Sequence, residues 1–86
     1  MADHKSALKS IRQTKKRTER NHSRVSRIRT HIRQVEEAIT AGEKKKAETS
    51  FRTMQSELMR GVQRNLFHLN TAARKLSRTW ARIKAL

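Results

Sequence analysis

The fold of this chain is decided by the segment from residue 25 to residue 42, VSRIRTHIRQVEEAITAG. Its large apolar residues recur at steps of 3, 4, 3 and 4, and they are Val25, Ile28, Ile32, Val35 and Ile39. This spacing places them on one side of an α-helix, at the near-heptad interval of helical bundles. Gly42 follows as the residue type best suited to a left-handed C-terminal cap. The segment therefore predicts a helix that ends at about residue 41 and packs against other helices.

Upstream of residue 25 the same helix is expected to continue without a core to pack on. Asp3 or Ser6 is a suitable N-terminal cap, so a first helix is predicted over about residues 6–41, roughly 54 Å long. Residues 12–24 contain no large apolar side chain and several cations three or four positions apart, which oppose helix formation. We expect this part to fray or unfold in the free protein and to become a rigid helix on a phosphate-rich surface.

Two further apolar stripes predict two shorter helices. The second helix, over about residues 44–64, carries the stripe Ala47, Phe51, Met54, Leu58 and Val62. The third, over about residues 66–84, carries the stripe Leu69, Ala73, Leu76, Trp80 and Ile83. Between them, Asn65 is the non-glycine residue best able to adopt a left-handed cap. The chain is therefore expected to be all-α, a single domain over residues 1–86 that folds as an antiparallel three-helix bundle with a long, projecting, basic first helix.

The charge of the chain indicates a polyanionic partner. Its 22 Lys and Arg against 7 Asp and Glu give a formal net charge of +15. Residues 1–34 and 60–86 carry all of the excess, with net charges of +9 and +7, whereas residues 35–59 are nearly neutral at −1. Nucleic acid is the favoured partner, because cationic side chains bind phosphate oxygens and release condensed counterions. A membrane surface is disfavoured, because the more basic arm has almost no apolar residues to insert, and no apolar run approaches the roughly 20 residues that span a bilayer.

Catalytic and metal-binding functions find no support in the sequence. There is no Cys, so disulfides and thiolate metal sites are excluded. His22 and His31, nine residues apart, would point to opposite sides of a helix, and Glu36 and Glu37 are adjacent and diverge. We expect no enzyme activity, no cofactor, no metal and no small-molecule substrate. The N-terminus lacks the apolar stretch of a signal peptide, which favours a cytoplasmic location.

Four stretches of the sequence resemble one known family. They are MADHKSALKS at residues 1–10, the set Asn21, Ser23, Arg29 and Thr30, AITAG at residues 38–42, and HLNTAARK at residues 68–75. Together they resemble the S20 family of bacterial small-subunit ribosomal proteins, over the whole chain. The resemblance implies a three-helix bundle that binds 16S ribosomal RNA (rRNA) directly within the 30S subunit, early in assembly and without catalysis. It implies contact with several RNA helices, chiefly through the first helix and the start of the third.

The resemblance also implies two sets of RNA-facing residues. By position, the first helix contributes Lys5, Ser6, Lys9, Arg12, Arg17, Arg20, Asn21, Ser23, Arg29 and Thr30. The second contact region contributes His68, Asn70, Arg74, Lys75 and Ser77. Four further cations of the same basic segments complete the predicted set, namely Lys16, Arg24, Arg27 and Arg78.

The sequence departs from the family pattern where apolar side chains replace frequent lysines. Leu8, Leu69 and Leu76 stand at such positions, and Arg64-Asn65 replaces the usual Lys-Gly. Any RNA contact made through those lysines is absent here. Leu69 and Leu76 are expected to thicken the core together with Trp80, which we interpret as a core residue rather than a surface for base stacking.

The sequence is compatible with three functions. The first is a structural ribosomal protein, monomeric when free, that fixes converging RNA helices through their phosphates. The second is a nucleoid or architectural DNA-binding protein, which composition alone supports almost equally. The third is a helical inhibitor or adaptor of an acidic enzyme.

Overall fold

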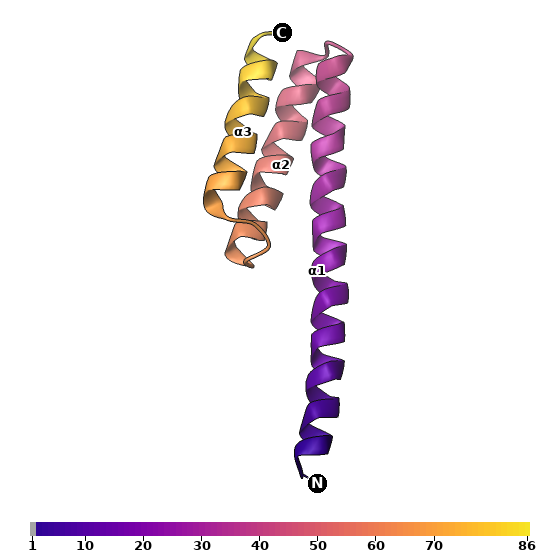
Figure 1. Ribbon diagram of the computed structural model, residues 1–86. Coiled ribbons are helices and arrows are strands. Elements are labelled where there is room, and N and C mark those ends of the chain that lie inside the picture. Colours follow the sequence, from indigo (N-terminus) through magenta and orange to yellow (C-terminus); the bar gives the residue numbers. More distant parts are fainter. Residues whose placement is uncertain (1) are drawn as a thin grey trace.

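The computed structural model describes the backbone of residues 2–86 and the side chains of residues 5–86. Within that part there are three helices and no strand: α1 (Ala2–Thr40), α2 (Lys44–Gln63) and α3 (Leu69–Lys84). Each helix reverses the direction of the one before it, and the C-terminus lies beside the turn between α1 and α2 (Figure 1). The prediction of an all-α chain with three helices is confirmed.

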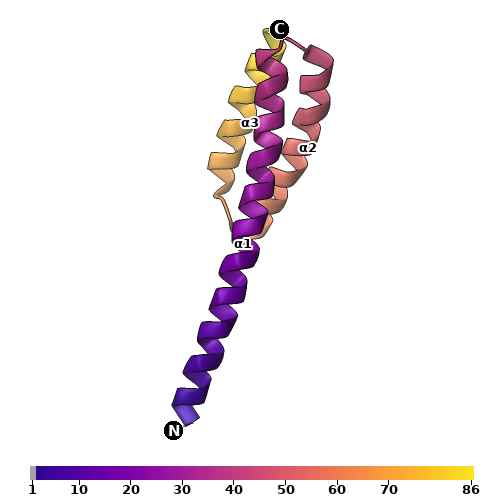
Figure 2. The ribbon, with the colours of Figure 1, turned by 90° about the vertical axis from the view of Figure 1, so that its right-hand side faces the viewer.

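The first helix is about twice as long as the other two. Because α2 and α3 lie beside only its C-terminal half, the N-terminal half of α1 projects beyond the bundle as a single rod (Figures 1 and 2). The molecule measures 64 × 22 × 14 Å along its principal axes. The helix begins at Ala2 rather than at residue 6, so the expected capping role of Asp3 or Ser6 is wrong, since both lie within the helix.

The first two helices are each followed by a left-handed residue at their C-terminal end, as the sequence predicts. Gly42 has a φ of 73°, its N–H donates to the carbonyl of Ile39, and the N–H of Glu43 donates to the carbonyl of Ala38, both at 3.0 Å. Asn65, with a φ of 60°, forms the same pair of bonds at the end of α2. This pattern satisfies carbonyls that a helix end leaves without partners, and it turns the chain sharply enough for the next helix to pack back.

The start of α3 is later than predicted, at Leu69 rather than at residue 66. Leu66 and Phe67 belong to the turn, where both are half-buried and pack against the core. His68 then caps α3, because its Nδ1 accepts a hydrogen bond from the N–H of Asn70 at 3.1 Å. The sequence pattern gave no sign of this, since histidine is not among the residues that ordinarily favour a helix N-cap.

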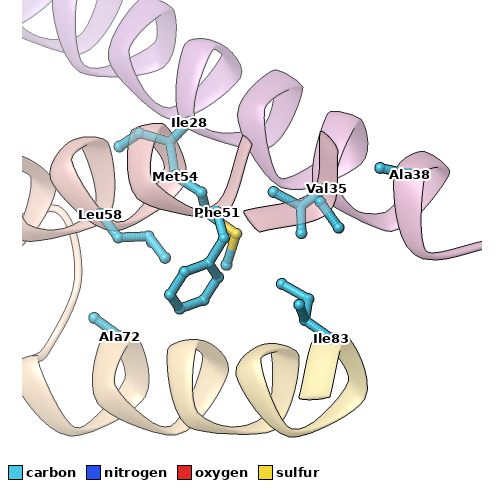
Figure 3. Packing of buried hydrophobic residues seen from close by; sticks show 9 residues of the cluster. Ile28, Val35, Ala38, Phe51, Met54, Leu58, Ala72 and Ile83 are labelled. Carbon is cyan, nitrogen blue, oxygen red and sulfur yellow. The ribbon is translucent and has the colours of Figure 1, made fainter. Parts of the chain in front are cut away.

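The core is small and draws on all three helices (Figure 3). Its buried apolar residues are Ile28, Val35 and Ala38 of α1, Ala47, Phe51, Met54 and Leu58 of α2, and Ala72 and Ile83 of α3. Val35, Met54 and Ile83 are fully buried, one from each helix. The stripes predicted for the first and second helices are confirmed, with Val25, Ile32, Ile39 and Val62 half-buried at their margins.

The stripe predicted for the third helix is wrong in part. Trp80 is 39% exposed, Leu69 is 51% exposed and Ala73 is exposed, whereas Ala72 and Thr79 are buried beside Ile83. The helix carries two overlapping stripes that share the half-buried Leu76, and the smaller side chains face the core. Thr79 can be buried because its hydroxyl donates to the carbonyl of Lys75 at 2.7 Å.

Gly61 allows a close approach that no other residue type would permit without adjustment. A Cβ at this position would lie 2.9 Å from Cδ2 of Phe67 and 3.1 Å from Cδ1 of Ile28. The ring of Phe67 therefore lies directly against the backbone of α2 and bridges the turn to α1.

Candidate nucleic-acid interface

The projecting part of α1 is a cationic rod. We define the basic arm as residues 5–20, all of which are exposed. Its seven cations are Lys5, Lys9, Arg12, Lys15, Lys16, Arg17 and Arg20, and its one acid is Glu19. Among the side chains of residues 5–86, none of these cations forms an ion pair. The arm therefore has a net charge of +6, from seven cations and one acid, and none of its cations is paired with a described carboxylate.

The predicted residues just beyond the arm lie where α1 meets the bundle. Asn21 and Arg24 are half-buried there, whereas Ser23, Arg27, Arg29 and Thr30 are exposed. Arg27 lies 3.9 Å from Glu57 of α2, and this pair joins the two helices at the surface. The Thr30 hydroxyl donates to the carbonyl of Ser26 at 3.0 Å. Every residue predicted on the first helix except the half-buried Asn21 and Arg24 is thus accessible to a partner.

A second cationic surface lies along α3. We define the α3 basic groove as a depression of about 410 Å³ lined by Thr71, Arg74, Lys75, Arg78, Thr79 and Arg82. Its charge is partly compensated by Glu36 of α1. Nζ of Lys75 donates to Oε1 of Glu36 at 3.2 Å, and a guanidinium nitrogen of Arg82 lies 3.9 Å from the same oxygen. Arg74 and Arg78 are exposed and form no ion pair with any described carboxylate. Arg74 and Arg78 therefore form the cationic edge of the groove, whereas Lys75 and Arg82 are paired with Glu36 of α1.

The α3 basic groove adjoins α1 at Arg29, nine residues beyond the end of the basic arm. Arg29 of α1 and Lys75 of α3 line one small pocket of about 180 Å³, together with Thr71 of the α3 basic groove. A polyanion that follows α1 from the arm toward the bundle reaches the α3 basic groove at this point. The fold thus brings together two predicted regions that lie about 40 residues apart in the sequence.

The predicted second contact region is divided by the structure. Arg74, Lys75 and Arg78 line the α3 basic groove, but Ser77 lines a different groove, between α2 and α3. His68 and Asn70 are exposed at the N-terminus of α3. Because the Nδ1 of His68 accepts the capping bond, the neutral ring carries its proton on Nε2, which can donate to an anion.

The sequence prediction missed one cation of the basic arm, Lys15, and three residues that line the α3 basic groove, namely Thr71, Thr79 and Arg82. Arg82 follows Arg74 and Arg78 at steps of four, so helical spacing alone could have found it. Thr71 carries no charge, and only its position in the fold indicates it.

Other kinds of site are not indicated in the part of the chain that the structure describes. No group of three or more His, Cys, Asp or Glu residues there could hold a metal ion. No helix there is both long enough and apolar enough to span a bilayer.

Comparison with known proteins agrees with the cationic, three-helix architecture. The model of the family described as ribosomal protein S20 matches residues 2–84. Two curated relatives are both named small ribosomal subunit protein bS20. The one from Paramagnetospirillum magneticum is 52% identical over 86 residues, which cover all of this chain and 96% of the relative. The one from a Ruegeria species is 54% identical over 86 residues, which cover all of this chain and 99% of the relative. With its fold, its cationic surfaces and its full-length likeness in agreement, the chain belongs to the ribosomal protein S20 family.

Proposed function

We propose that this protein is a structural constituent of the small ribosomal subunit that binds 16S rRNA directly and holds RNA helices together during assembly. Family membership supports the ribosomal role and a function without catalysis. The observation that supports direct RNA binding is the basic arm, which presents seven exposed cations, none of them paired with a described carboxylate. The protein acts as a monomer before assembly and on the cytoplasmic ribosome afterwards, with no cofactor, metal or small-molecule substrate.

The arm recognises RNA through shape and phosphate rather than through base sequence. The deep groove of A-form RNA gives side chains little access to base edges, so contacts to the backbone dominate. The seven cations of the basic arm cover a little more than half of the helix circumference, so this side of the arm can lie against the phosphates of two converging RNA helices. Lys5, Ser6, Lys9, Arg12, Lys16, Arg17, Arg20, Asn21, Ser23, Arg24, Arg27, Arg29 and Thr30 are the residues to which we assign this role.

The α3 basic groove provides a second anchor at a fixed distance from the arm. Arg74, Lys75 and Arg78 are assigned to phosphates there, and His68, Asn70 and Ser77 flank them on the same helix. Since α1 and α3 are packed on one core, phosphates bound by the arm and by the groove are held in a fixed relative position. This rigid separation is what would allow a small protein to set the geometry between RNA segments.

The test is the salt dependence of binding to protein-free 16S rRNA. If about eight phosphates are neutralised, the logarithm of affinity falls with the logarithm of salt concentration at a slope of about −6 to −7. Replacing Arg17 and Arg20 by alanine should make the slope less steep by about two units, roughly one per lost contact. The melting temperature of the free protein should not change.

Lys44→Ala with Lys45→Ala is the matched control. It removes the same charge from exposed positions at the start of α2, outside both cationic surfaces, so the slope should stay within one unit of the unmodified protein. Co-sedimentation with salt-washed 30S particles tests the ribosomal role independently. A slope near −1, or equal affinity for duplex DNA of the same length, would contradict direct rRNA recognition.

A further inference from the structure

An apolar groove on the opposite side of α3 from the basic groove is not accounted for by phosphate binding. It has a volume of about 490 Å³ and is lined by Phe51, Arg52, Gln55, Ala73, Leu76, Ser77 and Trp80. It is a shallow depression that is largely open to solvent. Most of its lining is apolar, and a bulky aromatic side chain stands in it 39% exposed.

Trp80 is held in a defined position at this surface. Its ring packs on Phe51 with the ring centroids 5.2 Å apart and the planes inclined by 37°. Phe51 is itself a core residue, 9% exposed, so its ring cannot move away easily and it holds the ring of Trp80 in place. An aromatic ring that is fixed by the core but left partly open is a pre-organised surface for stacking, because little side-chain entropy remains to be lost on binding.

The polar residues of the groove suit a nucleobase. Arg52 supplies guanidinium donors, Gln55 supplies an amide with both a donor and an acceptor, and Ser77 supplies a hydroxyl. These are the groups that can bind the edges of a base or its sugar and phosphate while the ring stacks. No carboxylate is among the lining residues, so nothing in the groove repels a phosphate.

Charge decides between the candidate occupants. A second copy of this chain would bring another +15 against the first, which opposes self-association. A polyanion is attracted by the same charge. The groove also contains Arg52, whose guanidinium attracts the phosphates of an RNA strand that places a base on Trp80.

We propose that the groove between α2 and α3 binds one unstacked base of 16S rRNA by stacking on Trp80, an inference that rests on the proposed function. Unpaired bases in loops and bulges are the parts of RNA that proteins commonly stack on aromatic side chains. This assigns a contact with a base to a protein whose other proposed contacts are to phosphate.

Trp80 is the only tryptophan of the chain, so its fluorescence reports on the groove directly. In a titration of the full chain with protein-free 16S rRNA, stacking should quench the emission in a saturable way, with the same midpoint as binding. Trp80→Leu keeps an apolar side chain but removes the stacking surface. Its affinity should fall about 5- to 150-fold, the equivalent of one stacked base, with the salt slope unchanged. Trp80→Phe should recover part of the loss.

Leu69→Ala is the matched control, because Leu69 is an exposed apolar residue of the same helix that does not line the groove. Its affinity should stay within twofold, and melting of each free variant verifies that the bundle is intact. Unquenched emission on bound rRNA, with Trp80→Leu binding as tightly as the unmodified protein, would overturn the stacking proposal and leave the proposed function standing. No binding to rRNA at all would instead overturn the proposed function. Quenching that requires other small-subunit proteins would assign the groove to a protein partner and also overturn the proposal.

Discussion

Lys75 of α3 donates a hydrogen bond to Glu36 of α1 across 3.2 Å, with both side chains about 40% exposed. The pair joins the two helices that carry the cationic surfaces, and Arg82 approaches the same carboxylate. An exposed pair of this kind contributes only about 0–1 kcal/mol to stability. Its larger effect is on binding, because Glu36 competes with any phosphate for Lys75 and Arg82.

Glu36→Gln should therefore strengthen rRNA binding and make the salt slope steeper by up to about one unit, because the α3 basic groove gains a free cation. The melting temperature should change little. Glu37→Gln is the control, since Glu37 is an adjacent exposed acid that pairs with no described cation and its substitution changes the net charge equally. Equal gains from the two variants would show that net charge, not release of Lys75, is responsible.

The basic arm should exchange its amide protons quickly in the free protein. Residues 5–20 are exposed all round and pack on nothing, and like charges three or four positions apart oppose an isolated helix. Hydrogen exchange should find strong protection from about residue 28 to residue 40 and little in the arm, with protection of the arm appearing on addition of rRNA. Strong protection of the arm without RNA would refute a helix that forms on binding.

Gly61→Ala should destabilise the bundle, although alanine favours helices. The gain in helix propensity is about 1 kcal/mol, whereas overpacking a core costs about 1–3 kcal/mol. Chemical denaturation of four proteins tests the cause: the unmodified chain, Gly61→Ala, Phe67→Ala and the double variant. Because the ring of Phe67 occupies the space of the new methyl group, Gly61→Ala should be neutral or stabilising when Phe67 is alanine. An equal loss in both backgrounds would contradict the steric explanation.

Met54→Ala should cost far more stability than Trp80→Ala. Met54 is fully buried, and truncation of such a residue costs about 2–5 kcal/mol. Trp80 is 39% exposed, so its truncation leaves no enclosed cavity, and the cost is its partial burial together with the pairing with Phe51, which is worth about 0.5–1.5 kcal/mol beyond its area. Circular dichroism of the free variants should show Met54→Ala largely unfolded and Trp80→Ala folded. If Trp80→Ala were unfolded and Met54→Ala folded, Trp80 would have to be a core residue.

The sequence by itself determined the helices α1 and α2, their C-terminal ends and the cationic character of the first. Apolar residues at helical spacing and left-handed caps are local properties, so Gly42 and Asn65 could be assigned without knowledge of the fold. The projection of the arm could be predicted for the same reason, because a segment without apolar side chains has nothing to bury.

Only the tertiary structure decided which face of α3 is buried, which cations are free and where the second site lies. On α3, two apolar stripes share Leu76, and periodicity favours the larger side chains of Leu69 and Trp80. The packed bundle instead buries Ala72 and Thr79, because small residues let the helices approach closely. Likewise, the pairing of Lys75 with Glu36 depends on an approach between residues 39 positions apart. Contacts of this kind come from the way three helices share one core, and no local pattern in the sequence encodes them.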